Sequence, residues 1–333
     1  METVIPPPVA FKDRKAGLIV FGVLTLLAGC LSASFVPLTI LAQSMTATHG
    51  GELNYYTTIP AVVLYGSAAI ALIWLGIGSI LTRRWARALL LIASWSALFI
   101  GSISAGMMAF MVRRFPELMR AAKQPGQPEL PPGMDTVVIV IIVATCLFLY
   151  VFIPLIWVLF YGSRHVKATC EVRDPVIRWT DRCPLPVLAV SLWLVLGTLM
   201  MLTVPVAYHG VFPFLGMFLT GVPGSLLNLV MAALWAYCAW AFYKLDWRGW
   251  WILIVALIVF AVSGTITYSR HDIIELYRLI GYPEKQIELI QKVSFVTRDL
   301  IVWGTLVSFV PVFGYLLYVR RFFPRGAKTT IAP

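Results

Sequence analysis

The stretch Thr136–Tyr161, TVVIVIIVATCLFLYVFIPLIWVLFY, decides the fold class of this chain, because it contains no Asp, Glu, Lys or Arg. A helix that crosses a bilayer needs about 20 predominantly apolar residues. Backbone amides in hydrocarbon must also be satisfied within the segment itself, which only a helix or a closed barrel achieves. The stretch therefore predicts a transmembrane helix.

Seven further stretches have the same apolar, uncharged character. They are Gly17–Ala42, Pro60–Leu81, Ala88–Val112, Leu185–Tyr208, Val222–Tyr243, Trp250–Tyr268 and Ile301–Val319. With 60% hydrophobic and only 12% charged residues, the chain has more apolar surface than one soluble core hides. We predict an all-α polytopic membrane protein of eight transmembrane helices, and a cell (plasma or inner) membrane as its location.

The distribution of basic residues predicts the orientation, since positively charged loops are retained in the cytoplasm. With both termini placed inside, the inner segments hold 17 of the 26 Lys and Arg residues and the outer loops hold nine. The acidic residues divide into six inside and nine outside, so the inner face carries a net charge of +11 and the outer face none. This charge fits insertion topology and attraction to anionic headgroups, or a docking face for an acidic partner.

Three patterns recur at nearly the same offset along the chain and predict a tandem duplication. Phe152-x-Pro154-x6-Tyr161 returns as Phe309-x-Pro311-x6-Tyr318, an offset of 157 residues. Glu117-Leu-Met-Arg120 returns as Glu275-Leu-Tyr-Arg278, and Gln127-Pro-Glu-Leu130 returns as Gln286-Ile-Glu-Leu289. Four helices per copy is an even number, so the two repeats enter the membrane in the same sense and are parallel.

The expected organisation follows from these repeats. It consists of a cytoplasmic tail (1–16), a first four-helix repeat (17–163), a cytoplasmic connector (164–184), a second repeat (185–320) and a cytoplasmic tail (321–333). The connector includes CEVRDPVIRWTDRC at 170–183. A structural zinc site needs four Cys or His ligands, usually arranged as two close pairs. The connector offers three such residues, Cys170, Cys183 and His165, and no two of them form a close pair. We interpret the connector as a structural joint at the membrane surface.

Several function classes lack the residues that they need. Ion-coupled transport generally uses ionisable groups at membrane depth, and the eight stretches contain no acidic or basic residue. Intramembrane proteolysis needs a nucleophile beside a base, or a metal with His and carboxylate ligands. The basic residues are scattered over five short loops, so nucleic acid is not an expected partner. We therefore expect no enzyme activity, no catalytic residue, no metal and no cofactor.

The remaining polar residues are weak binding candidates. Ser263, Thr265 and Thr267, together with Asn228, whose amide lies well within a predicted span, either pack helices together or line a polar cleft. His49, His209 and His271 lie on the predicted outer side, where they either bond to water and backbone or converge on a metal or haem. The segment 204–224, VPVAYHGVFPFLGMFLTGVPG, is unusually apolar for a loop, and a re-entrant segment is one interpretation of it.

Three function classes fit these observations. The first is a non-enzymatic binding, assembly or membrane-organising protein, with the lipid bilayer and another membrane protein as partners. The second is a facilitator or transporter of a neutral or lipid-like small molecule, with the interface of the repeats as its path. The third is a redox subunit with a cofactor on the outer histidines.

Overall fold

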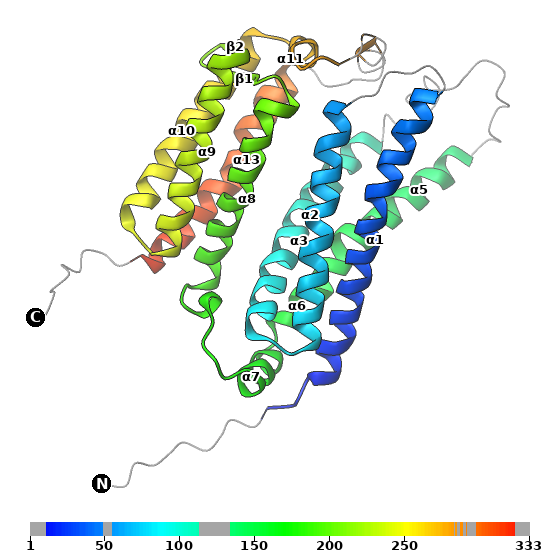
Figure 1. Cartoon of the computed structure of the whole chain (residues 1–333), viewed down its shortest axis with the longest axis vertical. Coiled ribbons are helices and arrows are strands. Elements are labelled where there is room, and N and C mark those ends of the chain that lie inside the picture. The colour runs from blue at the N-terminus through cyan, green and yellow to red at the C-terminus, as the bar shows by residue number, and fades with distance from the viewer. Residues whose placement is uncertain are drawn as a thin grey trace, which may run out of the picture. The chain divides into compact units, whose positions relative to one another are not determined.

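The structure, a computed structural model, describes residues 11–48, 55–112, 134–282 and 298–323, together with Glu284, Ile287, Glu288 and Gln291. Eight of the described helices are long and apolar enough to cross a membrane, which confirms that prediction (Figure 1). The repeat motifs at 117–120 and 127–130, and two of the four residues of the counterpart at 286–289, lie outside the described residues. The chain divides into two compact units, Met1–Ala42 with Val62–Arg182 (unit 1) and Gln43–Ala61 with Cys183–Pro333 (unit 2).

The helices of unit 1 follow the predicted stretches with small shifts at their ends. They are α1 (Lys15–Thr48), α2 (Tyr55–Ile80), α3 (Arg84–Val112), α5 (Met134–Leu147), α6 (Ile153–Gly162) and α7 (Arg164–Arg173), with the first residues of α2 and the last of α1 assigned to unit 2. A π-helical turn, η1 (Phe148–Phe152), joins α5 to α6 immediately before Pro154. Proline cannot donate to the preceding turn, so a locally widened helix is a physical response to it.

The core of unit 1 lies at the end near α7. The hydroxyl of Ser79 on α2 donates to the carbonyl of Leu18 on α1 at 3.0 Å and lies 2.8 Å from the hydroxyl of Tyr161 on α6. Phe21 of α1 stacks on Phe160 of α6 with ring centroids 4.1 Å apart. These contacts satisfy polar groups away from water and tie three spans together.

The connector folds back onto the same end of unit 1. Asp174, which is 2% exposed, accepts a hydrogen bond from the Arg84 backbone amide and lies within ion-pair distance of Arg83 and Arg178, at 3.6 and 3.3 Å. A short 3-10 turn, η2 (Trp179–Asp181), brings Asp181 to 3.5 Å from Arg84. The charged residues of the connector therefore pair with one another and with the turn before α3.

The two connector cysteines are buried free thiols. Burial raises the pKa of the Cys170 thiol to about 11, although the nearby Arg87 guanidinium opposes the shift, and burial alone raises the pKa of Cys183 to about 11. Both thiols are accordingly protonated at neutral pH.

The described part of unit 2 from Cys183 onward contains four long helices and a small hairpin. The helices are α8 (Leu185–Ala207), α9 (Gly221–Tyr243), α10 (Trp247–Arg270) and α13 (Arg298–Val319), with the short α11 (Ile273–Leu279) and a final 3-10 turn η3 (Arg320–Phe322). Strands β1 (Phe212–Phe214) and β2 (Met217–Leu219) pair antiparallel, with Phe212 opposite Leu219. Helices account for most of the described residues, in agreement with the predicted all-α class. Within 204–224, the segment for which a re-entrant path was one interpretation, residues 212–219 form this short hairpin and pair their backbone groups with one another.

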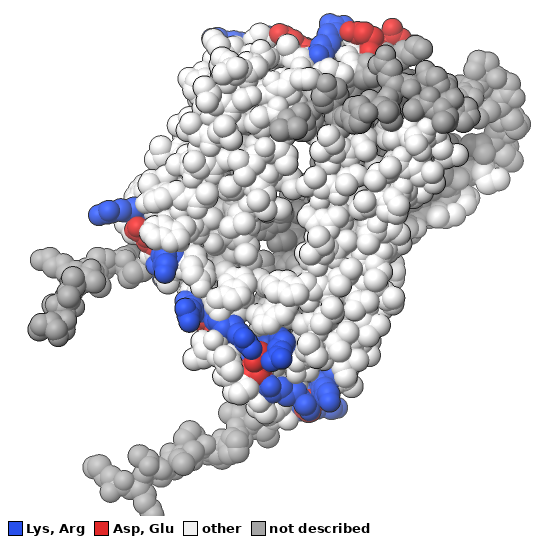
Figure 2. All heavy atoms as spheres, viewed as in Figure 1, with Lys and Arg blue, Asp and Glu red and all other residues white. Residues whose placement is uncertain are grey.

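Charged side chains gather at the helix ends of each unit on the face shown in Figure 2, where the sides of the helices are uncharged. In unit 2, the Trp250 indole donates to the Leu316 carbonyl at 2.9 Å and joins α10 to α13 near one of these ends. Aromatic residues with a polar handle are typical of a membrane–water boundary.

Candidate functional site

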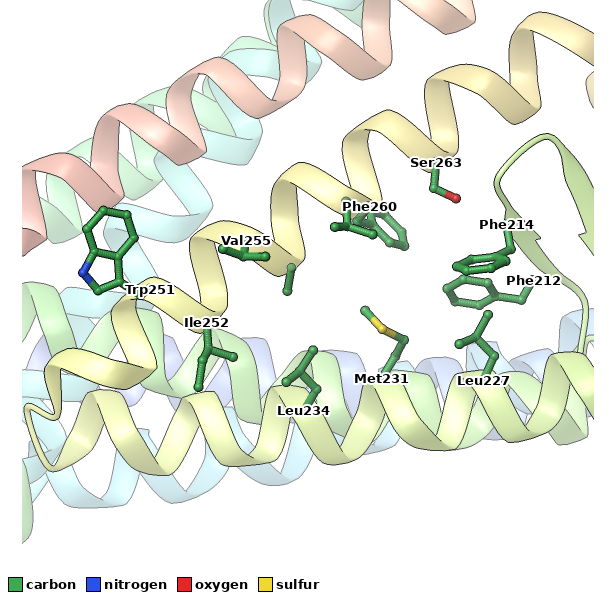
Figure 3. Close-up of a pocket in the computed structure, with 12 residues that line it drawn as sticks. Phe212, Phe214, Leu227, Met231, Leu234, Trp251, Ile252, Val255, Phe260 and Ser263 are labelled. Atoms are coloured by element: carbon green, nitrogen blue, oxygen red, sulfur yellow. The ribbon is translucent and has the colours of Figure 1, made fainter.

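Helices α9 and α10 are closest at the turn that joins them. Gly249 of α10 lies so near Ala241 of α9 that a Cβ at Gly249 would be 2.4 Å from the Ala241 Cβ. The turn between the helices closes with Leu245 at φ 58° and with Asp246, which accepts a hydrogen bond from the Arg248 amide. From this contact the two helices diverge along their length (Figure 3).

The hairpin occupies the wide end between α9 and α10. Its two-residue turn places Leu215 at φ 44° and Gly216 at φ 91°, as the tightest hairpin turns require. The Leu215 amide donates to the Ser263 hydroxyl at 2.8 Å, and the Gly216 amide donates to the Thr267 hydroxyl at 3.0 Å. Two hydroxyls one helical turn apart on α10 thus hold the turn in place.

An apolar groove of about 430 Å³ lies between α9, α10 and the hairpin, which is within the range of small-molecule sites. Its wall is made by aliphatic and aromatic side chains of the two helices, with the Phe212 and Phe214 rings at the wide end (Figure 3). The lining residues are Phe212, Phe214, Leu227, Met231, Leu234, Trp251, Ile252, Val255, Ala256, Val259, Phe260 and Ser263.

The groove has the length of one bilayer leaflet. The lining positions on α10 run from Trp251 to Ser263, which is roughly 18 Å at 1.5 Å per residue. One leaflet contributes about half of a 30 Å hydrocarbon core. Val255 and Val259 on the groove wall are 56% and 50% exposed, so the groove opens sideways along the helix pair.

The groove offers almost no polar chemistry to a ligand. Besides the Trp251 indole N–H, the polar group among its lining residues is the Ser263 hydroxyl, which accepts a hydrogen bond from the Leu215 amide and donates one to the Pro213 carbonyl at 3.4 Å. A ligand in the groove is therefore recognised by shape and by the absence of hydrogen-bonding groups.

Three of the sequence candidates meet at the hairpin turn. Besides Ser263 and Thr267, the ring of His271 contributes its Nε2, 3.1 Å from the Gly216 carbonyl, and its Nδ1, 2.7 Å from a Glu275 carboxylate oxygen. Both ring nitrogens are thus occupied. Ser263 and Thr267 are four residues apart and share one face of α10, and His271 follows directly after the last residue of that helix.

The other candidates lie elsewhere. Asn228 is fully buried and donates to the Gly224 carbonyl at 3.0 Å, while its side-chain oxygen has no hydrogen-bond partner in the described part of the chain. Thr265 also has a buried hydroxyl that is unpaired among those residues. His209 lines a separate depression of about 460 Å³ beside Pro205, and His49 lies outside the described residues. Neither Asn228, Thr265 nor His209 lines the apolar groove.

Within the ranges that the structure describes, no group of three His, Cys, Asp or Glu side chains is arranged to hold a metal ion.

Sequence reasoning did not single out the groove residues apart from Ser263. Leu227, Met231, Val255 and Phe260 are ordinary residues for a membrane helix, and no local signal separates a groove wall from a lipid-facing surface. The phenylalanines of the hairpin fell inside 204–224, which was marked as unusual for its apolar composition.

Comparison of the chain with protein family models, with curated proteins and with solved structures gives no match.

Proposed function

We propose that the chain is a non-enzymatic membrane protein that binds one acyl chain of a membrane lipid in the groove between α9 and α10. The observation that carries the proposal is a predominantly apolar groove of leaflet length on a pair of membrane-spanning helices. A hydrocarbon chain needs no hydrogen-bond partner and fills a narrow groove by dispersion contacts. Such a site suits a lipid-binding or membrane-organising role.

The topology of this function is also a proposal. We place both termini and the α9–α10 turn on the cytoplasmic side of the cell membrane, because 17 of the 26 basic residues fall on that side. The tandem repeat is supported by the recurring Phe-x-Pro pattern, which lies at the start of α6 and within α13.

A photoactivatable phospholipid tests the proposal. The full chain is reconstituted into lipid nanodiscs with a small fraction of phosphatidylglycerol that carries a diazirine on one acyl chain, and labelled peptides are mapped after irradiation. We expect labelling to concentrate on residues 227–234 and 252–260. Val255→Trp, which fills the groove from its open side, should reduce this labelling to the level of ordinary lipid-facing surface.

Val310→Trp is the matched control. Val310 lies on α13, is 66% exposed and does not line the groove, so the same substitution there should leave groove labelling unchanged. Labelling that is uniform over all eight spans and insensitive to Val255→Trp would refute lipid binding in the groove. Transbilayer movement of the labelled lipid by the same vesicle-reconstituted protein would instead favour the facilitator class.

A further inference from the structure

Arg248 lies at the end of the groove near the α9–α10 turn. Arg248, Ile252, Val255 and Val259 are spaced by four, three and four residues, so they share one face of α10. Ile252, Val255 and Val259 line the groove, and Arg248 follows them one helical turn closer to the membrane boundary. The Arg248 side chain is exposed. Within the described ranges, Asp246 accepts a hydrogen bond from the Arg248 backbone amide and not from its guanidinium.

The two ends of unit 2 differ in net charge. The described residues at the α9–α10 turn and the end of α13 include four basic side chains and one acidic side chain, a net charge of +3: Lys244, Arg248, Arg320 and Arg321 against Asp246. At the other end of the unit, the sequence from residue 270 to residue 299 contains five basic and five acidic residues, a net charge of zero. An anionic headgroup is therefore attracted to the Arg248 end.

A second guanidinium at this end is fixed by aromatic rings. Arg320 lies 5.2 Å from the Trp247 ring centroid and 5.4 Å from that of Trp250, and its buried Nε has no hydrogen-bond acceptor within the described ranges. The Trp250 ring in turn contacts the Trp251 ring of the groove wall at 4.9 Å between centroids. Stacking of this kind holds a cation in place without neutralising it.

The hairpin closes the opposite end. The rings of Phe212 and Phe214 lie between Leu227 of α9 and Ser263 of α10 in Figure 3. Arg270 lies beyond this barrier, where its Nη1 is 2.9 Å from the Cβ position of Gly216. A lipid with its chain in the groove thus has its headgroup beside Arg248 and not beside Arg270.

On this basis, and resting on the proposed function, we infer that the groove binds an anionic phospholipid with its phosphate paired to Arg248. The chain terminus points toward the phenylalanines of the hairpin. The net charge of +3 at the headgroup end selects a net negative headgroup over a zwitterionic one. Because the pair is at the membrane surface, salt weakens the selection.

The test compares two photoactivatable lipids with identical chains, phosphatidylglycerol and phosphatidylcholine, in nanodiscs that hold the full chain. One basic residue near an anionic surface contributes about 1 kcal/mol, or about a fivefold preference. We expect wild-type groove labelling to favour phosphatidylglycerol by about that factor at low ionic strength. Arg248→Gln should abolish the preference, and Arg270→Gln, at the other end of the same helix, should preserve it.

The outcomes separate the two proposals. Groove labelling that is equal for both lipids and unaffected by Arg248→Gln overturns the headgroup inference while the acyl-chain site stands. A preference lost in Arg270→Gln and kept in Arg248→Gln overturns it as well, because the lipid then enters from the opposite leaflet. If neither lipid labels the groove of the wild-type protein above the level of ordinary lipid-facing surface, the proposed function itself is overturned.

Discussion

Thr267→Val isolates the hydrogen bond that anchors the hairpin on α10. Thr267 is fully buried, and its hydroxyl accepts from the Gly216 amide at 3.0 Å while donating to the Ser263 carbonyl at 2.8 Å. Valine keeps the shape but leaves the Gly216 amide without its acceptor, which costs about 1–3 kcal/mol. For a unit of this size, about 2 kcal/mol corresponds to a decrease in Tm of roughly 4–8 °C.

Thr305→Val on α13 is the matched control. Like Thr267, Thr305 donates its hydroxyl to the carbonyl four residues earlier, at 2.8 Å. Unlike Thr267, it accepts no hydrogen bond from a hairpin amide among the described residues. Thermal unfolding of both variants in the same detergent, followed by intrinsic fluorescence, measures the difference. Equal Tm values for the two variants would refute the anchoring role of Thr267.

Three further results are expected. Asp174→Asn should lower the free energy of unfolding by about 1–3 kcal/mol, measured by chemical denaturation. This loss is small for a buried carboxylate because solvent screens its two arginine partners, which are more than one third exposed. Cys170 should be alkylated at pH 8 about a hundredfold more slowly in the folded than in the denatured protein, because its pKa is raised to about 11. Its raised pKa contributes stability below about pH 9 that is lost as the pH rises through 11. A diazirine at the chain terminus should label peptides near Phe212, and one near the headgroup should label the peptide of Trp251.

The membrane-spanning helices were predictable because every backbone N–H and C=O group in hydrocarbon must be hydrogen-bonded within the protein. Thr136–Tyr161 was predicted as one helix, and the structure has a continuous span from Val137 to Gly162. The π-helical turn within it was not predictable, although Pro154 marks the place. Its position also depends on Gly101 of α3, where a Cβ would be 1.9 Å from the Tyr150 carbonyl oxygen. That requirement arises from contact between two spans, which no local pattern records.

The candidate site was predictable only in part. Ser263, Thr265 and Thr267 were expected either to pack helices together or to line a polar cleft. In the structure Ser263 and Thr267 accept hydrogen bonds from backbone amides of another segment, and the buried Thr265 hydroxyl has no partner among the described residues. The donating segment is the hairpin turn, which depends on the left-handed backbone of Leu215 and Gly216. Leucine is an uncommon residue in that conformation, so the sequence did not signal the turn.

The hairpin explains why an apolar groove between two membrane helices differs from lipid-facing surface in general. Helices that diverge from a tight contact such as Gly249 against Ala241 leave space that neighbouring lipids enter from any side. At the wide end of this space the chain instead supplies its own backbone, pairs it as β1 and β2, and fixes it to Ser263 and Thr267. The groove is thereby closed at one end and retains its positive charge at the other. A site with two different ends gives a bound lipid a direction, and direction distinguishes a binding site from an exposed apolar surface.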